Sequence, residues 1–266
     1  MFKDNRWRRM LQPGITAIVG AGGKTTVLER LGTYGHGGHL PMMVSSIVPM
    51  DSTRVDNVEP FDVICTEDVE KGEAFCAERI ASGHVPAWFA GLDDQDCYIG
   101  LDPKVIDEIK QRHPAWYILI EGDAGRDKWL KAPLADDIPL PDSCDTVIGV
   151  LNLQMLGNVI SGEKIEGVET AAAIMGRPCG AVITPAMLAK LIQHPRGLFR
   201  GTRCTRILFC TGYNSVQHRM TEALLDDLED FDLTASVLAD GYRETCTIRQ
   251  YLSLIHISEP TRLDVI

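Results

Sequence analysis

Short apolar runs alternate with amphipathic stretches along most of this chain. The apolar runs are rich in β-branched residues and are bounded by glycine or polar residues, which is typical of buried strands. Between them, apolar residues recur at helical spacing, as in Val27, Leu28 and Leu31. The pattern predicts strands at 15–19, 42–48, 61–65, 85–88, 97–100, 116–120, 146–150 and 206–210, and helices at 24–33, 67–81, 103–111, 184–192 and 217–228.

This alternation is typical of βαβ units, in which a mainly parallel sheet is covered by helices on both faces. We therefore expect an α/β fold of three layers. No polar linker marks a boundary, so residues 1–250 are predicted to form a single α/β domain. Asp102 followed by Pro103 predicts a capped start for one of the helices.

The last residues, 251–266, do not continue the preceding pattern. They resemble a translated sequencing adapter, and we expect them to be a non-native tail, which is set aside in reasoning about function. The alternative is a genuine β-tail.

Composition and charge exclude some classes of function. With 266 residues and a formal net charge of −11, the chain is acidic, which argues against a general nucleic-acid binder or an anionic-membrane binder. No apolar run is long enough to cross a membrane. The eight cysteines form no C-x-x-C pair and several stand in apolar runs, so we expect free, buried thiols and a cytoplasmic protein.

A glycine-rich loop follows the first predicted strand and leads into Lys-Thr-Thr. Glycines allow backbone N–H groups to converge on an anion, a lysine adds positive charge, and a threonine hydroxyl can bind Mg²⁺. The spacing Gly20-x-x-Gly23-Lys24-Thr25-Thr26 is shorter than a standard Walker A motif and resembles the loop of Mur ligases and some other P-loop proteins. We predict a phosphate cradle in a P-loop NTPase-like fold, formed by Gly20, Ala21, Gly22, Gly23, Lys24, Thr25 and Thr26.

A second block of interest follows the predicted strand 116–120, where Glu121 and Asp123 end an apolar run. Acidic residues at the carboxyl edge of a central strand can hold Mg²⁺ or orient a water, and either residue fits that role. Arg126 and Lys131 can neutralise phosphate charge, or they can be ordinary solvated surface residues. Ser45 and Ser46 end another strand and are open to the same two interpretations.

Together these segments resemble the YqeC family. The resemblance rests on Val19–Thr26, Ile120–Ala124, Leu130–Pro133, Thr184-Pro185 and His194–Leu198, and it covers residues 14 to 215 in order. It implies a bacterial P-loop nucleotide-binding protein that helps to mature selenium-dependent molybdenum hydroxylases, with the hydroxylase or its cofactor as partner.

The chain departs from the family pattern at two places. Strand 42–48 ends in Ser45-Ser46 instead of a run of threonines, and Cys210–Asn214 lacks the lysine and aspartate of a guanine-reading segment. A preference for GTP over ATP is therefore not predicted.

These observations predict a protein that binds Mg²⁺ with ATP or GTP. Lys24 would contact the β- and γ-phosphates while Gly20, Gly22 and Gly23 present N–H groups. Thr25 would bind Mg²⁺, and Glu121 or Asp123 would hold the metal or position water, so that Lys24, Glu121 and Asp123 are the candidate catalytic residues. The alternatives are a nucleotide-gated adaptor that does not hydrolyse, and an ATP-dependent ligase or kinase that acts on a small substrate.

Overall fold

A sheet of nine strands runs through the molecule in the order β14-β13-β12-β10-β1-β8-β2-β5-β4. All its neighbouring pairs are parallel except β13 with β14. The computed structural model describes residues 5–56, 60–134, 137–200 and 202–253. The strands of the sheet are β1 (Gly14–Gly20), β2 (Met42–Ser46), β4 (Phe61–Cys65), β5 (Val85–Phe89), β8 (Tyr117–Glu121), β10 (Thr146–Asn152), β12 (Thr205–Thr211), β13 (Ala235–Asp240) and β14 (Thr247–Ser253).

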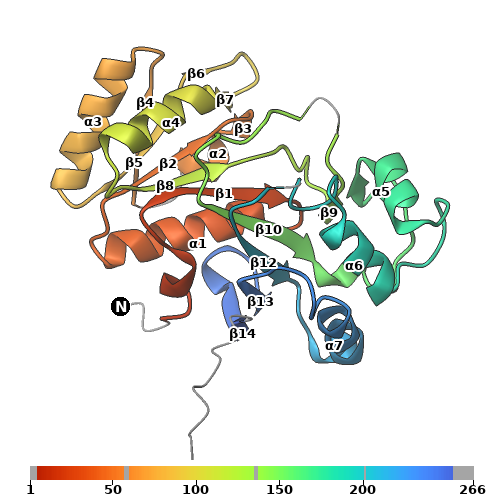
Figure 1. The fold of residues 1–266 in the computed structure, drawn as a ribbon. Coiled ribbons are helices and arrows are strands. Elements are labelled where there is room, and N and C mark those ends of the chain that lie inside the picture. Colours follow the sequence, from red (N-terminus) through yellow and green to blue (C-terminus); the bar gives the residue numbers. More distant parts are fainter. Residues whose placement is uncertain (1–4, 57–59, 135–136, 201, 254–266) are drawn as a thin grey trace, which may run out of the picture.

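Helices cover both faces of this sheet, as Figure 1 shows for α1 and α4 on opposite sides. One face packs on α3, α4, α5, α6 and α7, which contribute residues such as Ile106, Leu188 and Leu224 to its core. The other face packs on α1 and on the N-terminal segment, through Val27, Leu31 and Trp7 among others. The helices are α1 (Lys24–Gly37), α2 (Thr53–Asp56), α3 (Val69–Ala81), α4 (Pro103–Arg112), α5 (Val168–Met175), α6 (Pro185–Gln193) and α7 (His218–Asp226).

Two small sheets and short 3₁₀ turns complete the fold. Strands β9 (Leu130–Lys131) and β11 (Ile165–Glu166) pair in parallel, while β3 (Met50–Asp51), β7 (Cys97–Ile99) and β6 (Gly91–Leu92) form an antiparallel sheet. The 3₁₀ turns are η1 (Arg8–Met10), η2 (Leu153–Met155), η3 (Ser215–Gln217) and η4 (Arg243–Thr245). Among the described residues, no helix is both long and apolar enough to cross a membrane.

The α/β class, the mainly parallel sheet and the helices on both faces confirm the prediction. The predicted caps are present too, since the Asp102 side chain accepts a hydrogen bond from the backbone N–H of Lys104 at 2.8 Å and Pro103 begins α4.

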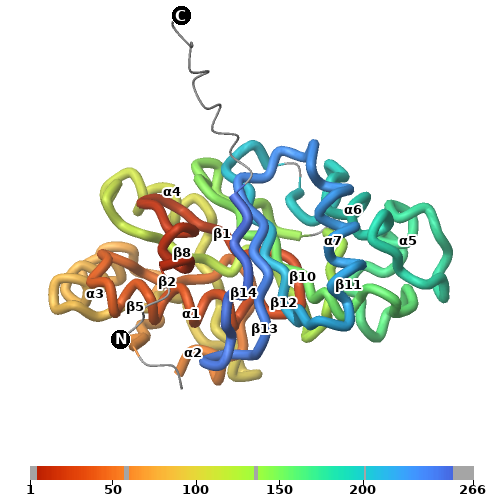
Figure 2. Tube along the Cα trace, turned by 90° about the horizontal axis from the view of Figure 1, so that it is seen from below, coloured from red at the N-terminus to blue at the C-terminus, as the bar shows by residue number. Residues whose placement is uncertain are grey.

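Several expectations about individual elements were wrong. The first helix continues to Gly37 instead of ending near residue 33, and helix 217–228 is followed by two strands that the pattern did not predict. Figure 2 shows these strands, β13 and β14, beside β12. Residues 251–253 of the expected tail belong to β14, and 254–266 lie outside the described residues.

The cysteines are all free, as expected, but their burial is uneven. Cys76, Cys210 and Cys246 are buried, whereas Cys65 and Cys179 are exposed. Cys65 stands in an apolar run and was expected inside, but its strand, β4, is at the edge of the sheet.

Candidate functional site

The glycine-rich loop joins the end of β1 to the start of α1. Gly20, Gly22 and Gly23 all have positive φ angles, of 93°, 81° and 138°. A Cβ atom on Gly22 would lie 2.6 Å from the carbonyl oxygen of Trp129. The loop therefore needs glycine for its backbone conformation and for the close approach of the neighbouring chain.

The loop leaves a run of backbone N–H groups without acceptors. Within the described part of the chain, nothing accepts a hydrogen bond from the N–H groups of residues 22–26, and no side chain caps α1. These groups stand at the positive end of the helix dipole, which favours an anion.

Two residues of the predicted cradle depart from this arrangement. The N–H of Gly20 donates to the carboxylate of Asp123 at 3.0 and 3.1 Å, and the N–H of Ala21 donates to the carbonyl oxygen of Val150 at 3.0 Å. The expectation that Gly20 presents its N–H to a phosphate is corrected, because Asp123 already occupies that donor.

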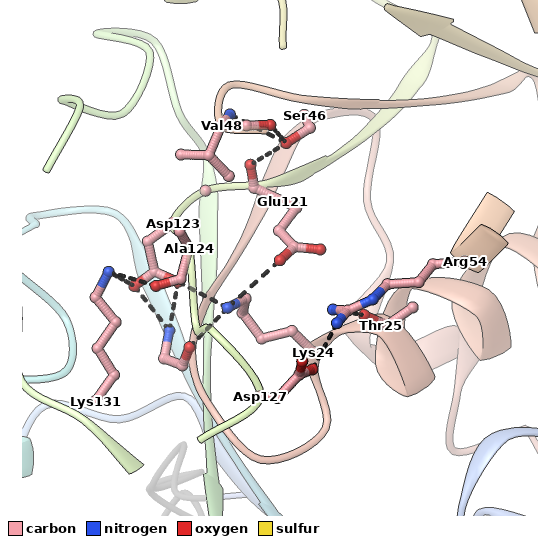
Figure 3. A network of polar contacts seen from close by, with 12 residues as sticks. Lys24, Thr25, Ser46, Val48, Arg54, Glu121, Asp123, Ala124, Asp127 and Lys131 are labelled. Carbon is pink, nitrogen blue, oxygen red and sulfur yellow. Dashed lines mark hydrogen bonds and ion pairs between the residues drawn. The ribbon is translucent and has the colours of Figure 1, made fainter. Parts of the chain in front are cut away.

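Lys24 lies at the centre of the polar network in Figure 3. Its amine donates to the carbonyl oxygen of Gly20 at 2.8 Å and lies 3.1 Å from Asp123 and 3.4 Å from Glu121. Burial disfavours the charge on this lysine, but the two carboxylates outweigh it, so the pKa of Lys24 is raised. The amine therefore keeps its proton.

Glu121 lines a pocket together with the glycine-rich loop, Lys24 and Thr25. Its side chain is buried, and Oε2 has no hydrogen-bond partner among the described residues. Burial raises the pKa of Glu121, the nearby Asp123 raises it further, and Lys24 opposes both. A buried carboxylate oxygen without a partner can hold a cation or accept a hydrogen bond from a water.

Thr25 and Glu121 are the metal-site candidates that line the pocket. Mg²⁺ is usually bound through one or two carboxylates together with phosphate oxygens and waters, so this pair suits it. Among the described residues, no group of three or more His, Cys, Asp or Glu that could hold a metal is found.

Asp123 has a different place from Glu121. Asp123 is 1% exposed and does not line the pocket. Its carboxylate accepts the hydrogen bond from the N–H of Gly20 and forms ion pairs with the amines of Lys24 and Lys131, the latter at 3.7 Å. It therefore fixes the loop and the lysine. Of the two carboxylates left open by the sequence, Glu121 is the one placed to meet a metal or a water.

The two basic residues after the acidic pair are separated by the fold. The amine of Lys131 is buried and contacts the carbonyl oxygen of Ala124 and the carboxylate of Asp137, each at 2.8 Å. Lys131 does not line the pocket and is not on the surface, so it is neither placed to neutralise a phosphate there nor an ordinary solvated lysine. Arg126 lines the pocket, is mostly exposed, and forms an ion pair with Glu166 at 3.1 Å.

A sequence model of the family described as "YqeC protein" matches residues 16–169, more than half of the chain. The chain belongs to the YqeC family. The matched segment contains the glycine-rich loop, Glu121, Asp123 and Lys131.

One curated relative is named "Uncharacterized protein YqeC", from Escherichia coli (strain K12). It is 29% identical over 157 residues, which are 58% of this chain and 61% of the relative. The match thus spans about three fifths of the length of that relative. No solved structure matches this YqeC chain.

Several residues of the pocket were missed in the sequence. The pocket has a volume of about 440 Å³, and Arg54, Asp127, Tyr242 and Arg243 stand in its wall. Arg54 reaches the hydroxyl of Thr25 at 3.4 Å and pairs with Asp127 at 2.5 Å. The backbone N–H of Arg243 donates to the hydroxyl of Thr26 at 3.4 Å.

One signal for these residues was present. Ala235–Ala239 is a short apolar run that ends in Asp-Gly, and the same criterion that identified 116–120 would have placed Tyr242 after a strand. Nothing comparable marks Arg54. Ser45 and Ser46 were candidates but point elsewhere, since they donate to the carbonyl oxygens of Trp88 and Val48 at 2.7 and 2.6 Å.

Proposed function

We propose that this YqeC chain binds a nucleoside triphosphate, ATP or GTP, together with Mg²⁺. The observation that carries the proposal is the run of unpaired N–H groups of residues 22–26 at the uncapped start of α1, beside the protonated amine of Lys24. Such a combination suits a polyphosphate more than a single carboxylate, because many donors converge on one small volume.

Each group of the pocket has a role in this proposal. The N–H groups bind phosphate oxygens, and Lys24 turns from Glu121 and Asp123 towards the β- and γ-phosphates. Thr25 and Glu121 would hold Mg²⁺, which when bound neutralises charge on the phosphate oxygens. Arg54 contacts Thr25 and adds a positive group at the same end of the pocket.

The nucleoside is expected to extend towards η4. Tyr242 is 62% exposed and stands in the pocket wall, where its ring offers a stacking surface to a base. Stacking alone is tolerant of base identity, which agrees with the absence of a guanine-reading segment.

The binding proposal is tested by calorimetry with ATP and GTP, with and without Mg²⁺. Wild type should bind, Lys24→Ala should lose at least about tenfold in affinity, and Thr25→Ala should lose the dependence on Mg²⁺. Lys190→Ala, an exposed lysine on α6 outside the pocket, is the matched control. Circular dichroism and urea unfolding check that each variant is folded. Binding that is absent in wild type, or undiminished in folded Lys24→Ala, would overturn the proposal.

We further propose that the nucleotide is hydrolysed, with Glu121 positioning the attacking water. The support is the buried oxygen Oε2, which has no other partner among the described residues. Glu121→Gln should still bind nucleotide through the N–H groups and Lys24, with a weaker dependence on Mg²⁺, and should release phosphate more slowly by about 10²–10⁴-fold, the range for general acid–base catalysis. If wild type binds nucleotide but releases no phosphate, the nucleotide-gated adaptor takes the place of the hydrolase.

What the nucleotide serves is proposed from the family resemblance alone. The proposed role is the maturation of a selenium-dependent molybdenum hydroxylase. A hydroxylase made in cells without this protein should be inactive. Wild type should restore its activity, and Lys24→Ala should not.

A further inference from the structure

A second, smaller cavity lies next to the pocket of the glycine-rich loop. It has a volume of about 130 Å³, and Arg126 lines both cavities. Val48, Leu134 and Ile138 give the smaller cavity an apolar side. Arg126 and Asp127, in the loop after β8, have φ angles of 43° and 57°, which residues with a side chain rarely adopt. The chain thus holds an arginine in an unfavourable conformation at the boundary between two cavities.

Lys131 and Asp137, which line the smaller cavity, are already engaged with each other. The amine of Lys131 contacts the carboxylate of Asp137 and the carbonyl oxygen of Ala124, each at 2.8 Å. It also lies 3.7 Å from Asp123, and Figure 3 shows it reaching both Ala124 and Asp123. The second carboxylate oxygen of Asp137 accepts a hydrogen bond from the N–H of Leu134 at 2.8 Å. Lys131 and Asp137 therefore shape the cavity and leave the binding of a ligand to other groups.

Glu166 is a buried residue of this cavity that keeps an open oxygen. The residue is 9% exposed, and its Oε1 lies 3.1 Å from the guanidinium of Arg126. No described residue donates a hydrogen bond to its other oxygen, Oε2. A buried carboxylate oxygen is costly unless a ligand or a water donates to it. Arg126 uses one nitrogen in the ion pair, so other N–H donors of its guanidinium can meet a ligand.

The charges of the cavity favour a ligand that carries both signs. A simple anion would meet Glu166 and Asp137, and a simple cation would meet Arg126 and Lys131. A zwitterion can instead place its carboxylate on Arg126 and its ammonium on Glu166. The volume of about 130 Å³ is the share of about four waters at roughly 30 Å³ each, so the ligand must be small.

We propose that this cavity binds a small α-amino acid with an apolar side chain, of the size of alanine. Its carboxylate meets Arg126, its ammonium meets Oε2 of Glu166, and its methyl group packs on Val48, Leu134 and Ile138. The ion pair between Arg126 and Glu166 opens to admit it, which the 67% exposure of the Arg126 side chain allows. A carboxylate on Arg126 stands at the border of the larger pocket, where it suits a second substrate of the nucleotide. That role rests on the proposed nucleotide binding, and the amino-acid site itself does not.

Calorimetry of the full chain with L-alanine, in the absence of nucleotide, tests the site. L-Alanine should bind at one site per chain. Propionate lacks the ammonium, ethylamine lacks the carboxylate, and L-phenylalanine is too large for the cavity, so each should bind at least about tenfold more weakly. No binding of L-alanine, or binding of any of the other three that is as tight, would overturn the proposal.

Two variants locate the bound amino acid. Glu166→Gln and Arg126→Gln should each lose at least about tenfold in affinity for L-alanine, because each removes one charged partner. Glu169→Gln and Arg177→Gln change exposed residues outside the cavity and should keep the wild-type affinity. Circular dichroism and urea unfolding check that each variant is folded. Undiminished affinity in folded Glu166→Gln would overturn the proposal.

A titration with ATP and Mg²⁺, with and without L-alanine, separates this site from the nucleotide proposal. If ATP binds and L-alanine does not, the amino-acid site is wrong and the nucleotide proposal stands. If L-alanine binds and ATP does not, the site stands and its role as a second substrate falls. If both bind, each should change the affinity of the other by the same factor, because Arg126 lines both cavities. Unchanged affinities would overturn the role as a second substrate.

Discussion

Glu121 combines burial, an unpartnered oxygen and a neighbouring carboxylate at a single residue. Burial is the main reason that its folded-state pKa lies above the ordinary value of 4.5. The folded chain thus holds this proton to a higher pH than the unfolded chain does. In the window that begins near pH 4.5, the folded state binds more protons, so the free energy of unfolding falls as the pH rises through it.

Glu121→Gln should therefore flatten the pH dependence of stability. We expect the free energy of unfolding of wild type to decrease more steeply than that of the variant as the pH rises above 4.5, by up to about 1.4 kcal/mol per pH unit, the slope for one proton. Urea unfolding at several pH values measures it. Glu169→Gln, an exposed residue of α5, should keep the wild-type slope. Equal slopes in wild type and Glu121→Gln would show that this carboxyl does not carry the effect.

The two lysines of the site show what the sequence can and cannot predict for single residues. Lys24 could be placed because the glycine loop fixes its surroundings locally. Lys131 could not, because its burial depends on Asp137 and on the pairing of β9 with β11, which bring residue 166 beside residue 131. Only the folded structure shows that the buried amine of Lys131 forms an ion pair with Asp123 at 3.7 Å.

The glycine-rich loop is the element whose geometry the proposal needs most. Gly22→Ala would place a side chain at φ 81°, 2.6 Å from the carbonyl oxygen of Trp129. Gly180 offers a matched control, since it has φ 87° but no atom within 4 Å of the added Cβ. The comparison separates the cost of the backbone conformation from the cost of crowding.

We expect Gly180→Ala to lose about 1–2 kcal/mol of stability, the cost of a left-handed conformation in a residue with a side chain. Gly22→Ala should lose more than this and should also weaken nucleotide binding, because Trp129 and the loop must separate. Urea unfolding and calorimetry measure the two effects. A loss of stability no greater than that of Gly180→Ala would mean that the loop tolerates a side chain.

The strands from β4 to β12 in the sheet were predicted from the sequence pattern, but β13 and β14 at the other side were not. β1, β8 and β10 are buried and apolar, so each reads as a continuous run. β14 is mostly exposed and carries no such run, whereas β13 is a buried apolar run that the same criterion would have identified. In the first helix, the glycine-rich segment 35–39 suggested an end, but Met42 lies close to Gly35 and Phe61 close to Gly32, so tertiary contacts keep the helix intact.

At the scale of the whole molecule, the sheet joins the segment that matches the family to the segment beyond it. β10, within the match, pairs with β12 over its whole length of seven residues, and α6 packs on the same core. On the other face, Ile207 and Phe209 of β12 belong to the same core as Val27 and Val150 of the matched segment. The matched segment therefore relies on residues after 183 for both faces of its core.

A fragment of residues 1–183 should consequently fail to fold by itself. Without β12 and α6, β10 would become an exposed apolar edge strand, which promotes aggregation, and the cores on both faces would open to solvent. All four tryptophans stay in the fragment, so tryptophan fluorescence can follow urea unfolding in both chains. The full chain should show one cooperative transition and the fragment none, with the fragment sedimenting as large particles. A monomeric fragment with a cooperative transition would instead mean that the family segment is an independent unit, and that β12, β13 and β14 are an addition to it.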